Sequence, residues 1–201
     1  NGNFISPAEA IPILEESGLI IPVGKWIIQN AFSMCTECRK YYPEFRVSIN
    51  LSYVQILKSP LMMELKQMIE CSGISCSGII VELTESGYLE GTPAVRSVWN
   101  DMKQLRIQIA LDDFGTGYSN LMNISNLEPD IVKLDRGFTL KALSRSYEYQ
   151  LMQYVIEMVH KLNQYVCVEG VETKEDLEKI KALGPDLIQG YYYSKPCSRN
   201  E

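Results

Sequence analysis

The chain has 201 residues, and its hydrophobic share of 46% excludes a disordered segment and predicts one globular domain with a buried core. Acidic residues outnumber basic residues by 25 to 19, so the formal net charge is −6, which argues against a broad nucleic-acid-binding surface and predicts no DNA partner. No apolar run approaches the roughly 20 residues of a membrane span, and the first ten residues do not resemble a signal peptide.

Two helices are predicted before the first strand. One begins after Ser6 and ends at Gly18, and the other covers about Val23–Tyr41. The second helix contains Cys35 and Cys38 with the CxxC spacing. Six cysteines in a chain of this length are too few for a disulfide scaffold, and we interpret the pair as reduced thiols in preference to a metal site.

Short apolar runs rich in β-branched residues predict buried parallel strands. In chain order, these runs are Phe45–Leu51, Gly78–Leu83, Ile107–Leu111, Ile131–Leu134, Tyr165–Val168 and Asp186–Tyr191. Helical patterns follow most of them, over Leu61–Cys71, Ala94–Leu105, Ser144–Asn163 and Thr173–Leu183. Alternating strands and helices predict an α/β fold with a parallel sheet, without a linker that would divide the chain.

Polar side chains stand at the carboxyl end of each predicted strand. In strand order, they are Asn50, Glu82, Asp112 with Asp113, Lys133, Glu169 and Gln189. Glu85 and Glu172 lie just beyond two of these ends. Because a (β/α)8 barrel assembles its chemistry at the carboxyl ends of its strands, this serial placement predicts one functional site.

The residue types in this set favour a divalent metal site. Four carboxylates close together repel one another unless protons or cations intervene, and carboxylate and amide oxygens suit Mg²⁺ or Mn²⁺. The adjacent Asp112 and Asp113 are placed to serve two ions about 3.5–4 Å apart, the arrangement used in phosphodiester cleavage. Lys133 could orient a water or balance charge, and the sole histidine, His160, is predicted to be a surface or packing residue.

Each of these residues also has a structural interpretation. The aspartate pair could be a turn or cap, Lys133 could extend along an apolar surface to water, and Glu172 could favour the next helix start. The tyrosine run 191–193 is interpreted as packing in preference to a base-stacking platform. The repeated placement at successive strand ends favours the metal site over these separate explanations.

The segment Phe114–Ser119, which reads FGTGYS, follows the aspartate pair. Gly115 and Gly117 allow tight turns and close backbone approach, so we interpret the segment as a mobile active-site loop. The Glu85 carboxylate could anchor it by accepting hydrogen bonds from the loop backbone or from Thr116.

Several motifs occur together and in order along the chain. They are SINLS at 48–52, ELTES at 82–86, DDFGTGYSN at 112–120, VKLDR at 132–136, VEGVET at 168–173 and QGYYYSKP at 189–196. Together with the opening FISPAEAIPILEESGLIIPVGKWII, they resemble the EAL domain family over essentially the whole chain. Asn120 stands where the family usually has serine, a difference from which we expect little effect.

The resemblance implies a (β/α)8 barrel that hydrolyses the bacterial messenger cyclic di-GMP to linear pGpG with two Mg²⁺ or Mn²⁺ ions. It implies metal ligands at Asn50, Glu82, Asp112, Asp113 and Glu169. It implies catalytic roles for Lys133, Glu169, Gln189 and Glu85, with Lys133 holding the attacking water and Gln189 supporting the water around the metals. It implies substrate binding by Asp113, Gly115, Thr116, Gly117 and Tyr118, and a supporting role for Glu172.

The name-giving Glu-Ala-Leu tripeptide and its following arginine do not occur in this sequence. We therefore expect residues 1–201 to form a partial EAL domain that lacks the first two strands, with a complete catalytic set in the parent protein. Alone, the chain should bind the first metal poorly. By the resemblance, the parent is expected to be a homodimer with an upstream sensor or nucleotide-cyclase domain. We expect it to be cytoplasmic, or the cytoplasmic part of a membrane-anchored protein.

Three alternatives remain beside the enzyme. The first is a receptor that binds cyclic di-GMP without cleaving it, and the second is a degenerate EAL scaffold that acts through protein contacts. The third is an unrelated metal-dependent barrel enzyme in which Lys133 abstracts a proton from a carbon acid. An assay with cyclic di-GMP distinguishes three of these functions. Turnover indicates the enzyme, binding without turnover indicates the receptor, and absence of both indicates the scaffold.

Overall fold

The computed structural model describes residues 5–84, 92–116 and 127–197. These residues fall into two compact units. The first unit contains residues 5–83 and 92–109, and the second contains residue 84 together with 110–116 and 127–197. Among the described residues, no helix combines the length and the apolar character that a bilayer span requires.

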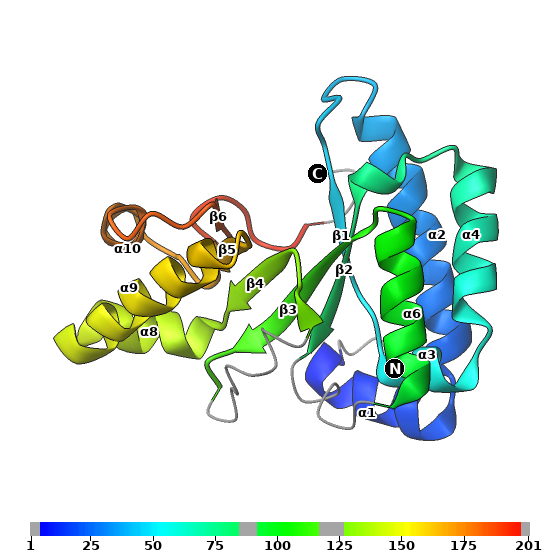
Figure 1. Cartoon of the computed structure of the whole chain (residues 1–201), viewed down its shortest axis with the longest axis horizontal. Coiled ribbons are helices and arrows are strands. Elements are labelled where there is room, and N and C mark those ends of the chain that lie inside the picture. Colours follow the sequence, from blue (N-terminus) through cyan, green and yellow to red (C-terminus); the bar gives the residue numbers. More distant parts are fainter. Residues whose placement is uncertain (1–4, 85–91, 117–126, 198–201) are drawn as a thin grey trace. The chain divides into compact units, whose positions relative to one another are not determined.

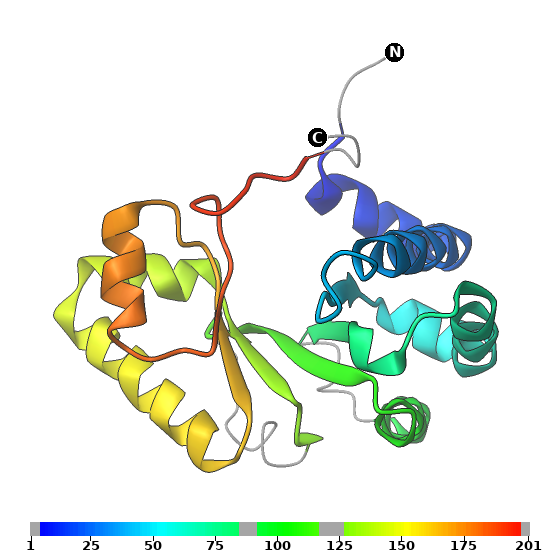
Figure 2. The same cartoon turned by 90° about the horizontal axis from the view of Figure 1, so that it is seen from above.

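In the first unit, two parallel strands lie beside a layer of helices. The strands are β1 (Val47–Asn50) and β2 (Ile79–Thr84), and Asn50 is the register partner of Glu82. The helices are α1 (Pro7–Ser17), α2 (Ile20–Cys38), α3 (Tyr53–Lys58), α4 (Leu61–Ser72) and α6 (Pro93–Gln104), with a 3-10 turn at Cys76–Gly78. Figures 1 and 2 show α2, α4 and α6 side by side, and α2 also contacts β1.

Local signals explain most of the helix boundaries in this unit. Gly18 ends α1 with φ 75, a left-handed conformation that favours glycine. The second predicted helix begins earlier than Val23, at Ile20, because Pro22 lies in the first turn, where its missing N–H costs no helical hydrogen bond. Helix α3 was not predicted, although Ser52 and Gln55 form a capping box at its start.

In the second unit, four strands pair in parallel, each with the next in the chain. They are β3 (Gln108–Phe114, whose first two residues belong to the first unit), β4 (Ile131–Leu134), β5 (Tyr165–Val168) and β6 (Leu187–Ile188). The helices are α8 (Arg136–Ser144), α9 (Ser146–Lys161) and α10 (Lys174–Lys181). Helices α8 and α9 lie side by side, and α9 packs on β5 (Figure 1). Strand and helix alternation with parallel pairing in chain order confirms the predicted α/β class.

Three boundaries in the second unit differ from the prediction. Strand β3 does not end at Leu111 but continues through the aspartate pair to Phe114. The register with β4 shifts between Leu111 and Phe114, and this shift allows the two strands to stay paired up to Phe114. Strand β6 is shorter than the predicted Asp186–Tyr191. Helix α8 was not predicted. It begins after Asp135, whose Oδ1 accepts a hydrogen bond from the Gly137 N–H at 2.7 Å.

Candidate active site

In the first unit, two predicted metal ligands lie next to each other. Asn50 and Glu82 are register partners at the carboxyl ends of β1 and β2, so their side chains lie on the same face of the strand pair. The Glu82 residue is only 7% exposed. Its Oε1 accepts a hydrogen bond from the Ser48 hydroxyl, which lies two residues before Asn50 on the same face of β1. This hydroxyl fixes the orientation of a buried carboxylate.

In the second unit, one buried ammonium group joins two carboxylates from neighbouring strands. Lys133 Nζ lies 3.0 Å from Asp112 Oδ1 and 2.7 Å from Glu169 Oε1. The side chains of Lys133 and Asp112 are 6% and 12% exposed, so this charge cluster is largely shielded from water. Lys133 stands in a strand in which all four residues are buried, which excludes the interpretation that its side chain reaches bulk solvent. A buried charge of this kind requires compensation, and the two carboxylates supply it.

The two adjacent aspartates have different environments. Asp112 is buried beside Lys133, whereas Asp113 is exposed and has φ 61, an unusual value for a residue other than glycine. The Asp113 N–H donates to Asp112 Oδ1 at 3.0 Å, so the second aspartate helps to orient the first. The local register shift in β3 produces this difference, because a bulge changes the direction of neighbouring side chains.

Two further predicted residues of the second unit, Glu172 and Gln189, have partners outside this cluster. The Glu172 carboxylate pairs with Arg136 at 2.8 Å, at the ends of β5 and β4. Gln189 is held by its backbone, which donates to Val168 O at 2.9 Å and accepts from Val171 N at 3.3 Å. Gln189 also lines an open depression of about 580 Å³ together with Tyr191 and Lys195.

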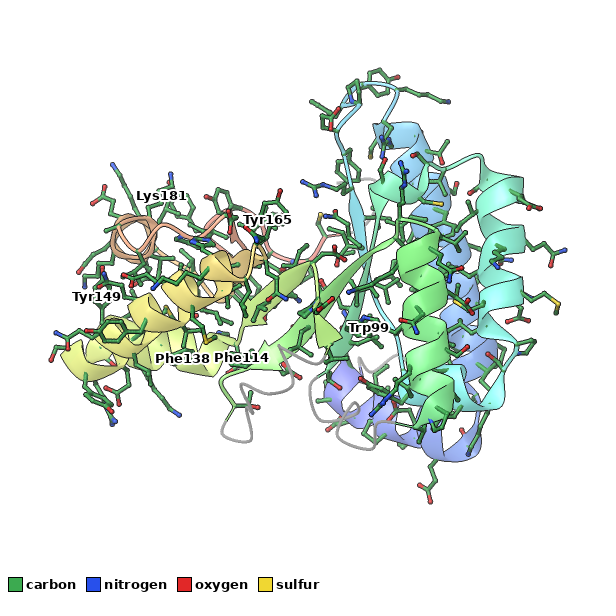
Figure 3. The ribbon with its side chains drawn as sticks, viewed as in Figure 1. Trp99, Phe114, Phe138, Tyr149, Tyr165 and Lys181 are labelled. Carbon is green, nitrogen blue, oxygen red and sulfur yellow. The ribbon has the colours of Figure 1, made fainter. Side chains whose placement is uncertain are left out.

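The start of the predicted active-site loop is described up to Thr116. Gly115 has φ 103, and a Cβ at this position would lie 2.8 Å from the ring of Phe138 on α8. Figure 3 labels Phe138 and Phe114, the residue before Gly115, in this part of the second unit. Glycine is therefore required at position 115, both by the positive φ and by the lack of space for a Cβ beside Phe138. The predicted loop residues Gly117 and Tyr118, together with Asn120 and the proposed loop anchor Glu85, lie outside the described residues.

The predictions for other residues had mixed outcomes. His160 is a surface residue as predicted, with its Nε2 2.8 Å from Asp186 Oδ2.

The tyrosines at 191–193 were predicted to be packing residues, but their side chains are exposed to solvent. The buried Cys35 thiol lies 3.7 Å from the Gly78 carbonyl oxygen, and burial raises the pKa of this thiol.

Sequence reasoning missed two residues that contact predicted site residues, Ser48 and Arg136. For each of them, its spacing from a predicted site residue could have indicated the contact. Ser48 precedes Asn50 by two positions, which places it on the same face of a strand. Arg136 follows Lys133 by three positions, just as Glu172 follows Glu169.

The side-chain oxygens at the ends of neighbouring strands are of the kind that bind a hard divalent cation. They occur as two small sets, Asn50 with Glu82 in the first unit and Asp112 with Glu169 in the second. Within the described ranges, no group of three or more histidine, cysteine, aspartate or glutamate side chains could hold a metal ion. Amide and carboxylate oxygens nevertheless match Mg²⁺ or Mn²⁺ better than a softer metal.

Parallel strands in chain order, with acids and a buried lysine at their carboxyl ends, define an α/β protein with an enzyme-like charge cluster. The EAL domain family model matches residues 1–196, and the chain belongs to the EAL domain family. This match confirms the resemblance that the sequence motifs indicated.

Named relatives and solved structures agree with this membership. The chain is 31% identical to the cyclic di-GMP phosphodiesterase PdeF of Escherichia coli, over 98% of the chain and 26% of PdeF. It is 28% identical to the bifunctional diguanylate cyclase and cyclic di-GMP phosphodiesterase MucR of Pseudomonas aeruginosa, over 96% of the chain and 28% of MucR. The chain thus spans about a quarter of the length of these curated relatives.

The solved structure of the PaMucR phosphodiesterase with cyclic di-GMP has a TM-score of 0.91 at 26% identity, covering 100% of this chain and 81% of PaMucR. This similarity confirms the predicted barrel-type α/β fold. BlrP1 of Klebsiella pneumoniae, solved with manganese and cyclic di-GMP, has a TM-score of 0.78 at 24% identity, covering 88% of this chain and 45% of BlrP1. At that identity it is evidence for the fold alone.

Proposed function

We propose that the protein containing this chain hydrolyses cyclic di-GMP to linear pGpG with two bound Mg²⁺ or Mn²⁺ ions. The observation that carries the proposal is the buried cluster of Lys133, Asp112 and Glu169 in a member of a family whose relatives include cyclic di-GMP phosphodiesterases. Buried charges are costly, and their gathering at strand ends favours an enzyme over a protein that only binds the nucleotide or only contacts other proteins.

The residues of this chain have separate roles in the proposal. Oxygen atoms of Asn50, Glu82, Asp112, Asp113 and Glu169 would hold the metals. When bound, divalent cations lower the pKa of a coordinated water and compensate charge on the leaving oxygen. Lys133 holds two of the ligand carboxylates, orients the attacking water, and shields the carboxylates from mutual repulsion.

Other residues bind the substrate or support the catalytic groups. We assign Gln189 to the water around the metals and Glu172 to the support of Glu169. Asp113, Gly115, Thr116, Gly117 and Tyr118 are assigned to substrate binding, with Glu85 anchoring their loop. We also propose that the protein is a homodimer with an upstream sensor or nucleotide-cyclase domain, and that it is cytoplasmic or the cytoplasmic part of a membrane-anchored protein. The bifunctional name of MucR illustrates the cyclase for that relative.

The test is an assay of the purified full-length protein with cyclic di-GMP and Mn²⁺, with product separation by chromatography and a parallel binding titration. We expect linear pGpG as the product, and no product after Mn²⁺ is removed by a chelator. Binding without turnover would replace the proposal with the receptor, and absence of both would replace it with the scaffold. Light scattering of the same sample tests the homodimer.

A further inference from the structure

Two ion pairs connect the same two segments of the second unit, one behind the other. Lys133 of β4 contacts Glu169 after β5 at 2.7 Å, and Arg136, three residues later, contacts Glu172. Arg136 donates two hydrogen bonds to Glu172 Oε1, from Nη2 at 2.8 Å and from Nε at 3.2 Å. The inner pair is buried and the outer pair is exposed to solvent.

The backbone between the two pairs packs directly on Arg136. Gly170 has φ 78, and a Cβ added there would lie 2.4 Å from Arg136 Cγ and 3.1 Å from its Cα. The turn that follows Glu169 therefore lies against Arg136 at van der Waals distance, and only glycine fits. Arg136 contacts the chain at Gly170 and at Glu172, both within three residues of the Glu169 carboxylate.

Arg136 belongs to a helix that is packed against the rest of the second unit. It is the first residue of α8, whose cap residue Asp135 also donates its N–H to Phe114 O at 3.0 Å. Helix α8 packs on α9 and α10. The segment 169–172 has no regular helix or strand of its own. Backbone hydrogen bonds hold it at two points, from Glu169 N to Leu134 O at 3.1 Å and from Val171 N to Gln189 O at 3.3 Å, and the Arg136 contacts add to these.

We propose that Arg136 is a positioning residue for Glu169, acting through the Gly170 turn and the Glu172 ion pair. We refer to the contacts of Arg136 with Gly170 and Glu172 as the outer latch. The latch supplements the Lys133 contact and the Glu169 backbone hydrogen bond, and so restricts the orientations in which the Glu169 carboxylate can leave Lys133. This inference rests on the proposed function for its effect on turnover, but not for its effect on the backbone.

The experiment compares four full-length variants. They are Arg136→Glu, Glu172→Arg, the double exchange, and Arg136→Gln, which removes the charge and keeps much of the side-chain volume. The matched control is an exchange of Glu175 and Lys179 on α10, an exposed pair at 2.8 Å in the same unit. Turnover of cyclic di-GMP, the Mn²⁺ concentration for half-maximal activity, and hydrogen exchange of the amides of 169–172 are measured for each.

We expect each single charge reversal to lower kcat or to raise the half-maximal Mn²⁺ concentration about tenfold, the usual effect of losing a group that orients a ligand. The double exchange should recover most of that loss, and amide exchange at 169–172 should rise in the single variants and in Arg136→Gln. The control exchange should change none of these quantities. Recovery in the double variant separates the ion pair from a general loss of folding.

Wild-type amide exchange in all single variants would overturn the latch, whether or not the protein hydrolyses cyclic di-GMP. So would single reversals that retain kcat and the Mn²⁺ requirement within twofold of wild type. A wild-type protein without turnover would overturn the proposed function, and the exchange measurement would then decide the latch independently.

Discussion

The two units hold their predicted metal-ligand carboxylates with different partners. In the first unit, Glu82 accepts a hydrogen bond from the Ser48 hydroxyl, whereas in the second unit Asp112 and Glu169 share the Lys133 ammonium. A hydroxyl donates one hydrogen bond and carries no net charge. An ammonium compensates charge as well as donating hydrogen bonds, so its removal leaves the buried Asp112 and the partly buried Glu169 carboxylates without their common cation.

This difference predicts an order of sensitivity. Breaking a buried ion pair by removing one partner costs about 3–5 kcal/mol, while a hydrogen bond to a charged group contributes about 1.5–3 kcal/mol. The Lys133 cluster should therefore be much less tolerant of substitution than the Ser48 contact. The variants below test that order, beginning with the two that should abolish turnover and ending with the Ser48 hydroxyl.

Replacing Lys133 by alanine should have the largest effect. We expect no measurable hydrolysis of cyclic di-GMP and a loss of about 3–5 kcal/mol of stability, because Asp112 and Glu169 lose their common cation. Product formation and urea unfolding measure the two effects. Lys141→Ala, which removes an exposed lysine from α8, is the control. Wild-type turnover of Lys133→Ala would contradict both the proposed role and the expected order.

Asp112→Asn should also abolish turnover, with a smaller loss of stability. The amide keeps the shape of the side chain and leaves Glu169 to compensate Lys133, so we expect at least a hundredfold fall in kcat and about 1–3 kcal/mol of destabilisation. Glu64→Gln is the matched control, because Glu64 also pairs with a lysine, Lys25, at 3.1 Å. An Asp112→Asn variant with more than a tenth of wild-type kcat would argue against this carboxylate as a metal ligand.

Gly170→Ala tests whether the position of Glu169 depends on the turn that follows it. Gly170 and Gly184 both have positive φ, but a Cβ at 184 meets nothing within 4 Å, whereas one at 170 meets Arg136. We expect about 1 kcal/mol of destabilisation for Gly184→Ala from backbone strain alone, and about 2–4 kcal/mol for Gly170→Ala from strain and overlap. Urea unfolding compares the two, and equal losses would remove the steric part of the argument.

Ser48→Ala should have the smallest effect of the set. We expect a loss of about 1.5 kcal/mol of stability and about tenfold weaker Mn²⁺ binding, because the hydroxyl orients Glu82 without compensating its charge. Ser48→Thr keeps the hydroxyl and should retain Mn²⁺ affinity. Ser77→Ala, which removes a hydrogen bond to Ser75 at 2.9 Å near the other end of β2, is the control. A Mn²⁺ titration that gives the same affinity for Ser48→Ala and wild type would show that this hydroxyl does not position Glu82.

The predictions from sequence were most accurate where a single segment carries its own signal. The bounds of β4 and β5 agree with the apolar runs, since a buried parallel strand is apolar on both faces. They were least accurate near the site. The continuation of β3 through Asp112 depends on its pairing with β4, which periodicity does not report. The start of α8 does carry a local signal, the Asp135 cap, which was not recognised.

The sequence by itself determined the class of the fold and the family, and it predicted Asp112, Lys133 and Glu169 as site residues, because polar side chains inside apolar runs are costly and therefore conspicuous. Only the tertiary structure decided that Lys133 lies between the other two, that Asp112 is buried while Asp113 is exposed, and that Arg136 holds the turn after Glu169. These contacts join residues far apart in the chain. Their distances follow from strand register and from one local bulge, which no short stretch of sequence specifies.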